Sequence, residues 1–270
     1  MMTAMTSMSS TFGVELRKAG TLRAVWAGAA VTVVGSVALA VLNAVSVRGA
    51  VDSGQSDLIS GSSPTSPVES GFTAMPITGV VGALVIGVVV IGSEYTADRA
   101  ESGGGRQIAT TLVSSPHRVT LLVTKILTVV ALVIATAVVT IPLSVGAAWV
   151  VTGSVAEESV SLSDALLRSG GATLYWACMG LIAFAFTVLT RSGVIPLVVF
   201  IANSSLVSVT FLLSRVTEVA NWLPDMAGRN LFGIEGADGG LDPLPGAVVM
   251  LVWTLVLLVI AGVVFERRDG

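Results

Sequence analysis

Residues Met75–Gly92 read MPITGVVGALVIGVVVIG and contain no charged side chain. A helix needs about 20 apolar residues to cross the hydrocarbon core of a bilayer, which is ~30 Å thick. The stretch is slightly shorter than that, but no charge interrupts it. It therefore predicts a transmembrane helix.

Five further stretches have a comparable length and apolar character: 24–47, 121–151, 171–190, 194–214 and 245–265. Pro142 and Pro196 fall inside two of them, where neighbouring helices can satisfy the backbone groups that proline frees. The stretch at 24–47 is longer than the roughly 7–15-residue core of a secretory signal, so we expect it to be retained. The sequence predicts an all-α integral membrane protein, a single transmembrane domain over residues 1–270 with six transmembrane helices.

The composition agrees with a membrane protein. Of the 270 residues, 53% are hydrophobic and 11% are charged, whereas a soluble domain usually carries about 25% charged residues. The single cysteine, Cys178, excludes an intrachain disulfide, and the single histidine, His117, argues against a histidine-based metal site. We expect no metal and no cofactor in this chain.

The basic residues predict the orientation of the spans, because cytoplasmic loops carry an excess of lysine and arginine. With the N-terminus in the cytoplasm, the inner side holds ten basic residues: Arg17, Lys18, Arg23, Arg99, Arg106, Arg118, Lys125, Arg191, Arg267 and Arg268. The outer side holds four: Arg48, Arg168, Arg215 and Arg229. This bias predicts a multi-pass protein of the cell membrane with both termini cytoplasmic.

The connections between the spans differ in character. Residues 47–74 are rich in serine, glycine and proline, which suggests a flexible outer loop. Residues 93–120 form a charged inner loop. The outer segment 215–244 contains scattered apolar residues, including Trp222. Because tryptophan is enriched at membrane interfaces, we expect this segment to lie on or dip into the outer leaflet.

The residues before the first span show a helical pattern. Apolar side chains recur at helical spacing at Phe12, Leu16, Ala19, Leu22 and Trp26. This spacing predicts an interfacial helix. Glu15 and Arg23 project into the same arc, so the pattern also fits a juxtamembrane extension of the first span.

Several catalytic and energy-coupling motifs are absent from the sequence. The glycine cluster Gly103–Gly105 is followed by Arg106 and lacks the lysine and hydroxyl of a nucleotide phosphate loop. Neither a serine-hydrolase elbow nor a His-Glu-x-x-His zinc motif occurs. No aspartate or glutamate lies deep in an expected span, which weighs against a self-driven secondary transporter. We expect the chain not to be an enzyme.

The inner loop contains a series of short motifs. It begins with Glu94-Tyr95 and continues through Thr110-Thr111-Leu112 and Pro116-His117-Arg118 to Lys125. This series resembles the permease subunits of the type-2 ATP-binding-cassette exporter family, which carry a Glu-Tyr pair, a Thr-Thr-Leu stretch, a Pro-x-Arg and a lysine in the same order. In this chain the stretch 96–107 is longer than in that pattern.

Two further stretches are similar to the same family. Residues 222–228 read WLPDMAG, like the Leu-Pro-x-x-Ala-Gly segment of actinobacterial members, and Glu15-Leu16-Arg17-Lys18 precedes the first span. The resemblance implies an N-terminal interfacial helix, a cytoplasmic coupling helix, and a re-entrant outer segment between helices five and six. It also implies a homodimer or heterodimer of permeases in the lipid bilayer, bound to two cytoplasmic ATPase subunits that hold ATP and Mg²⁺. No nucleic acid is implied.

These patterns assign candidate residues to three roles. The ATPase-coupling segment comprises Glu94, Arg106, Gln107, Ile108, Thr110, Thr111, Leu112, Pro116, His117 and Arg118. Ile108 and Leu112 are four residues apart and share one face of a helix, which Pro116 would end. The candidate substrate path comprises the polar residues Thr78, Asn203, Ser204 and Ser208. The re-entrant outer segment comprises Trp222, Leu223, Pro224, Ala227 and Gly228.

Each role has a simpler alternative. Glu94 also fits a solvated carboxylate at headgroup level, and Lys125 fits a lysine that snorkels to the interface. Asn203 and its neighbours also fit interhelical hydrogen bonding, and Thr78 with the glycines around it fits close helix packing. The inner-loop helix also fits one that lies against the chain's own spans.

Two hypotheses for the function follow. The first is a permease subunit of an exporter that moves an amphipathic, drug-like, peptide or lipid-like substrate outward with ATP hydrolysed by a separate chain. The second is a non-transporting membrane scaffold or sensor whose outer segment recognises a ligand. Association with a nucleotide-binding ATPase distinguishes them.

Overall fold

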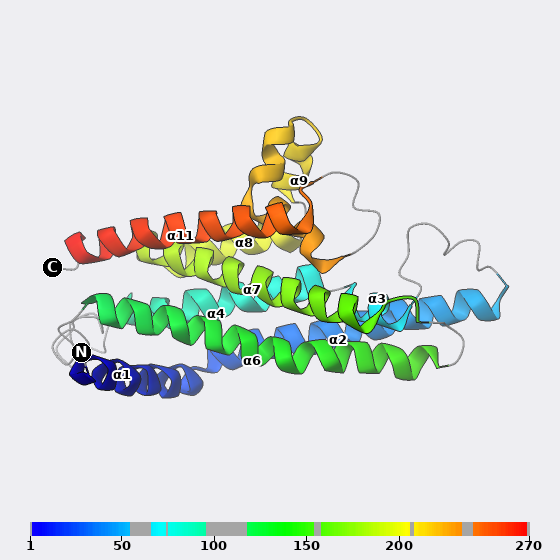
Figure 1. Ribbon diagram of the computed structural model, residues 1–270, viewed down its shortest axis with the longest axis horizontal. Helices are drawn as coiled ribbons and strands as arrows, with labels where there is room; N and C mark the ends of the chain where they lie inside the picture. The colour runs from blue at the N-terminus through cyan, green and yellow to red at the C-terminus, as the bar shows by residue number, and fades with distance from the viewer. Residues whose placement is uncertain are drawn as a thin grey trace.

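The computed structural model describes residues 2–54, 66–73, 75–95, 118–153, 158–205, 208–233 and 240–268. Within these ranges every regular element is a helix. The long helices run side by side along the long axis of the molecule, and both ends of the chain lie at the same end of the bundle, called here the terminal end (Figure 1).

Five helical stretches of the described chain are long and apolar enough to cross a membrane. Their main helices are α2 (Arg23–Asp52), α4 (Met75–Gly92), α6 (Arg118–Thr152), α7 (Leu162–Thr190) and α11 (Pro243–Arg268). These five correspond to the first, second, third, fourth and sixth predicted spans. The all-helical multi-pass architecture expected from the sequence is confirmed to this extent.

The fifth predicted span, 194–214, is not one continuous helix. It is replaced by α8 (Val194–Ser205) and α9 (Val209–Ser214). The Asn203 Oδ1 atom accepts a hydrogen bond from the backbone N–H of Val209 (3.0 Å), and the Ser208 side chain caps α9. Such side-chain bonds to the backbone compete with helix continuation. At 1.5 Å per residue, the 12 residues of α8 cover about 18 Å, which is less than a full crossing.

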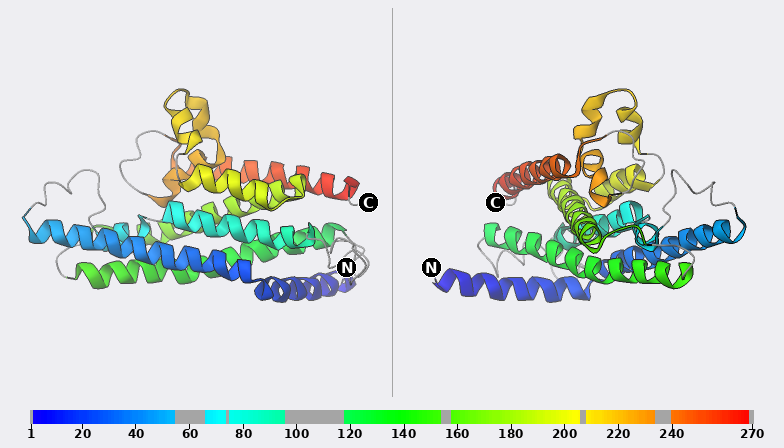
Figure 2. Two further views of the ribbon diagram at one scale, coloured as in Figure 1. Left: turned by 180° about the vertical axis from the view of Figure 1, so that it is seen from behind. Right: turned by 45° about the vertical axis from the view of Figure 1, so that its right-hand side comes forward.

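The expected N-terminal helix is present as α1 (Met2–Thr21). It is separated from α2 by Leu22, whose backbone is extended (φ −79°, ψ 113°). The indole Nε1 of Trp26 donates to the carbonyl oxygen of Gly20 (2.8 Å) and bridges the break. Figure 2 shows α1 set off from α2 at this point. A simple extension of the first span is therefore excluded.

Part of the predicted flexible loop 47–74 is folded. Helix α2 continues to Asp52, and a short helix, α3 (Pro67–Phe72), is buried. Ser66 and Glu69 form a reciprocal capping box at the start of α3. Residues 55–65 lie outside the described chain.

Glycines allow α4 to pack closely against its neighbours. A Cβ atom on Gly87 would lie 2.0 Å from the carbonyl oxygen of Gly180 on α7. A Cβ atom on Gly79 would lie 2.0 Å from the ring of Trp176, whose Nε1 donates to the carbonyl oxygen of Met75 (3.1 Å). Small residues at such contacts let helix backbones approach in a membrane. The packing interpretation of the α4 glycines is confirmed.

We expect Gly87→Ala to lower the free energy of unfolding by about 1–3 kcal/mol, because the added methyl group meets rigid backbone. The matched control is Gly49→Ala, since a Cβ atom at Gly49 on α2 meets nothing within 4 Å. The midpoint of thermal unfolding in detergent, followed by tryptophan fluorescence, measures both variants. Equal midpoints for the two variants would contradict the proposed close contact between α4 and α7.

Candidate functional site

Four charged side chains meet near the terminal end of the bundle and form what we call the charge cluster: Glu15, Lys18, Glu94 and Lys125. The Nζ atom of Lys125 lies 2.7 Å from the Oε2 atom of Glu15 and 2.8 Å from the Oε1 atom of Glu94. The Nζ atom of Lys18 lies 2.5 Å from the same Oε1 atom of Glu94. Two positive and two negative groups therefore balance within one network.

The charge cluster is almost closed to solvent. The exposed fraction of the side chain is 1% for Lys125, 0% for Glu94 and 7% for Glu15, whereas Lys18 retains 26%. Burying a charge is costly unless it is paired and hydrogen-bonded. The ammonium group of Lys125 has three N–H donors. Three acceptors surround it: the carboxylates of Glu15 and Glu94, and the carbonyl oxygen of Val90 at 3.5 Å. The lysine is therefore fully satisfied in the interior.

Three separate elements supply the charge cluster. Glu15 and Lys18 come from α1, Glu94 comes from the 3₁₀ helix η2 (Ser93–Tyr95) that follows α4, and Lys125 comes from the second turn of α6. The connection 96–117 leaves η2 and enters α6, so the cluster joins the two ends of this connection to each other and to α1. No other described ion pair links separate helices in this protein.

Glu94 is the one predicted coupling residue whose side chain lies within the described part of the chain. The others from Arg106 to His117 lie outside the described chain, as does the side chain of Arg118, the first residue of α6. The alternative that Glu94 is a solvated carboxylate is wrong, because the carboxylate is buried. The alternative that Lys125 snorkels to the interface is also wrong, because its Nζ atom turns inward to Glu15.

Glu15 and Lys18 were not predicted to belong to this site. One signal was present: Glu15 projects into the apolar arc of the N-terminal helix, and a carboxylate on a buried face requires a basic partner. Lys18 lies three residues further on and shares that face. The partner of Glu15 could not be predicted from the sequence, because Lys125 is 110 residues away along the chain.

The residues of the candidate substrate path lie at two places. Thr78 is on α4, where its Oγ1 atom lies 2.5 Å from the Oγ atom of Ser36 on α2. Asn203 on α8 donates to the Oδ2 atom of Asp225 (2.9 Å), and Ser208 caps α9. The side chain of Ser204 lies outside the described part. These contacts are those that the packing alternatives predict, and a role in a substrate path remains a prediction.

The predicted outer segment packs on α7 and α11 through α10 and η5. It contains η4 (Glu218–Trp222), α10 (Pro224–Ala227), which begins at Pro224 after the extended residue Leu223, and η5 (Arg229–Phe232).

Three contacts hold the segment in place. The Nε1 atom of Trp253 on α11 donates to the carbonyl oxygen of Trp222 (2.8 Å). A Cβ atom on Gly246 of α11 would lie 2.1 Å from the carbonyl oxygen of Ala227, and one on Gly228 would meet the Sδ atom of Met250. Close backbone contact thus fixes α10 on α11.

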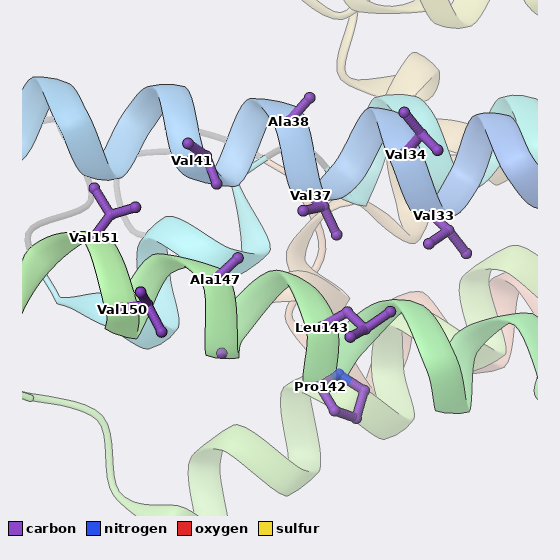
Figure 3. A pocket seen from close by; sticks show the side chains of 11 residues that line it. Val33, Val34, Val37, Ala38, Val41, Pro142, Leu143, Ala147, Val150 and Val151 are labelled. Atoms are coloured by element: carbon purple, nitrogen blue, oxygen red, sulfur yellow. The ribbon is translucent and has the colours of Figure 1, made fainter.

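An apolar groove opens between α2 and α6 (Figure 3). It has a volume of about 730 Å³ and is lined by Val33, Val34, Val37, Ala38, Val41, Pro142, Leu143, Gly146, Ala147, Val150 and Val151. None of these side chains can donate or accept a hydrogen bond, so the groove offers no chemistry for orienting a polar ligand.

The described residues contain no group of three His, Cys, Asp or Glu side chains that could hold a metal ion. Comparison with known proteins found no family model that matches the chain and no curated protein that matches it. The function is therefore inferred from the residues and their arrangement.

Proposed function

We propose that this chain is the transmembrane permease subunit of an ATP-binding-cassette exporter. Two permease chains assemble with two copies of a separate cytoplasmic ATPase, which binds ATP and Mg²⁺. The substrate is an amphipathic, drug-like, peptide or lipid-like molecule that moves outward across the cell membrane. The short motifs of the inner loop and the lack of a phosphate loop in the sequence support this proposal.

The observation that carries the proposal is the charge cluster. A permease driven by a separate ATPase must receive force through its cytoplasmic surface. The connection 96–117 is the longest stretch of chain available there. Because Glu94 and Lys125 join its two ends to α1, a displacement of the connection moves α1, α4 and α6 together. A buried ionic contact is costly to break. It therefore stays intact when the connection moves and transmits the movement to the three helices.

The position of the chain ends supports a sixth crossing. Five crossings would place the two ends on opposite sides of a membrane, but both lie at the terminal end (Figure 1). An even number follows if the chain from α8 to the start of α11 forms the remaining crossing. In this proposal the terminal end is cytoplasmic and α1 is the interfacial helix.

The outer segment is the re-entrant element in this proposal. The carbonyl oxygen of Trp222 bonds to Trp253, which lies ten residues into α11, about 15 Å from its start at Pro243. This contact places Trp222 beside the first half of α11.

Co-purification tests the proposed function. The full-length chain, carrying an affinity tag, is purified in mild detergent from its native cells, and its partners are identified by mass spectrometry. We expect a protein with a Gly-x-x-x-x-Gly-Lys-[Ser/Thr] phosphate loop in amounts similar to the chain itself. An unrelated multi-pass membrane protein with the same tag is the control. Purification without any nucleotide-binding protein would instead favour the scaffold or sensor hypothesis.

The proposed topology makes a separate prediction. Cysteines introduced at Ser62 and Gly239 should react with a membrane-impermeant maleimide in intact cells, whereas cysteines at Gly104 and Asp269 should not. The native Cys178 is buried, and labelling of the chain without an introduced cysteine gives the background signal. External labelling at Gly104 would contradict the assignment of the terminal end to the cytoplasm.

A further inference from the structure

Two arginines lie against one aromatic ring in the outer segment. The guanidinium carbons of Arg215 and Arg229 are each 5.0 Å from the centroid of the Phe211 ring. This distance is within the range of a cation–π contact. Because each carbon lies 5.0 Å from the same centroid, the two guanidinium carbons are at most about 10 Å apart. Two positive charges therefore lie beside one ring.

Neither guanidinium has an acidic partner among the described residues. The carboxylate of Asp225, in the same part of the fold, accepts hydrogen bonds from Asn203 (2.9 Å) and from the hydroxyl of Thr210. Each guanidinium carries five N–H donors in a planar fork that matches a phosphate group. The two side chains therefore retain donors for an anion.

The surroundings of this arginine pair are apolar and exposed. The exposed fraction is 84% for Val216 and 73% for Val219, and Trp222 is also exposed. The segment around α9 projects sideways from the bundle rather than along its axis (Figures 1 and 2). In a bundle whose long helices can cross a membrane, the sideways direction is the plane of the bilayer. Arginine side chains are long enough to reach the headgroup level from such a position while their apolar neighbours stay in contact with lipid.

We infer that Arg215 and Arg229 form a binding site for the phosphate group of an anionic phospholipid, with the exposed apolar residues of the segment in contact with its acyl chains. A free phosphate ion would use the arginines but not the apolar surface around them. This inference is independent of the proposed transport function, since a scaffold protein with the same outer segment would bind the same lipid.

The test measures lipid binding by the full-length protein in the complex in which it purifies. Native mass spectrometry gives the dissociation constant for added phosphatidylglycerol, phosphatidylcholine and, separately, inorganic phosphate. A basic residue near an anionic lipid surface contributes a factor of about five to the binding constant. We expect Arg215→Gln with Arg229→Gln to weaken phosphatidylglycerol binding about 30-fold, and each single variant about fivefold.

Two controls keep the test specific. Arg267→Gln removes an exposed arginine from the end of α11 and should leave phosphatidylglycerol binding unchanged. Arg215→Lys with Arg229→Lys keeps both charges and should retain most of the affinity. Unchanged phosphatidylglycerol binding in the double glutamine variant overturns the inference. Inorganic phosphate bound as tightly as phosphatidylglycerol, with the same dependence on both arginines, also overturns it, because the site would then be one for small anions.

Discussion

Replacing Lys125 with methionine is expected to lower the free energy of unfolding by about 3–5 kcal/mol, because the buried carboxylates of Glu15 and Glu94 lose their shared cation. Methionine has a similar length, so the loss of charge dominates over the loss of volume. Glu94 keeps Lys18, but Glu15 keeps no other described ion-pair partner. The midpoint of thermal unfolding in detergent, followed by tryptophan fluorescence, measures the effect.

Two further variants isolate the role of burial. Arg48→Met breaks the ion pair with Asp52, in which the two atoms are 3.8 Å apart and both side chains are more than half exposed. It also removes an exposed hydrogen bond from Arg48 to the carbonyl oxygen of Val151 (3.0 Å), and we expect a change within about 1 kcal/mol. Lys125→Met combined with Glu15→Gln removes both charges of one buried pair and should recover part of the stability. If Lys125→Met lowers the midpoint no more than Arg48→Met does, the charge cluster does not hold these helices together.

Replacing both Ile108 and Leu112 with aspartate is expected to abolish association with the ATPase. The two residues share one face of the predicted coupling helix, and an apolar face on a cytoplasmic helix requires a groove on a partner. Placing two carboxylates in such a groove without cationic partners costs several kcal/mol, enough for a loss of affinity of at least about 100-fold. The measurement is the amount of ATPase that co-purifies with the variant.

The control for this pair is Val113→Asp with Ser114→Asp, at two positions outside the predicted coupling residues. It places the same two charges on the opposite side of the predicted helix, and it should leave co-purification largely intact. Membrane extraction and elution volume show whether both variants insert and fold. Normal association of the Ile108 and Leu112 variant would place this helix against the chain's own spans instead.

The spans were predictable from the sequence because a bilayer imposes a simple requirement on composition and length. The bounds of α4 agree with the predicted span at 75–92, and α6, predicted at 121–151, extends from Arg118 to Thr152. Helix α7 begins at Leu162, nine residues before the predicted start. Ser161 caps its first turn, and the charged Asp164 in that turn lowers the mean hydropathy there.

The interruption of the fifth span was less predictable, although its cause is local. Asn203, Ser204 and Ser208 were recognised as polar residues within an apolar stretch, but polarity alone does not show whether a helix continues. The Asn203 Oδ1 atom accepts a hydrogen bond from the backbone N–H of Val209, and its amide nitrogen donates to Asp225 in the separate helix α10, a contact that the sequence does not show. Helix α3 was missed because its six residues are too few to show a hydrophobic period.

The charge cluster shows what a single sequence leaves open. Glu94 and Lys125 were singled out from motifs, but their burial depends on the position of α1. Lys18 and Glu94 are 76 residues apart, and no periodicity connects residues at that separation. The charges that pair in the fold were therefore recognisable individually, but not as a network.

The most direct test of the central claim is ATP hydrolysis by the complex that purifies with the full-length chain, reconstituted in lipid vesicles with Mg²⁺. The account predicts hydrolysis that elutes together with the chain and that is lost in the variant with aspartate at Ile108 and Leu112, but kept in the one with aspartate at Val113 and Ser114. A purified chain without any ATP hydrolysis, or hydrolysis that persists with aspartate at Ile108 and Leu112, would contradict it.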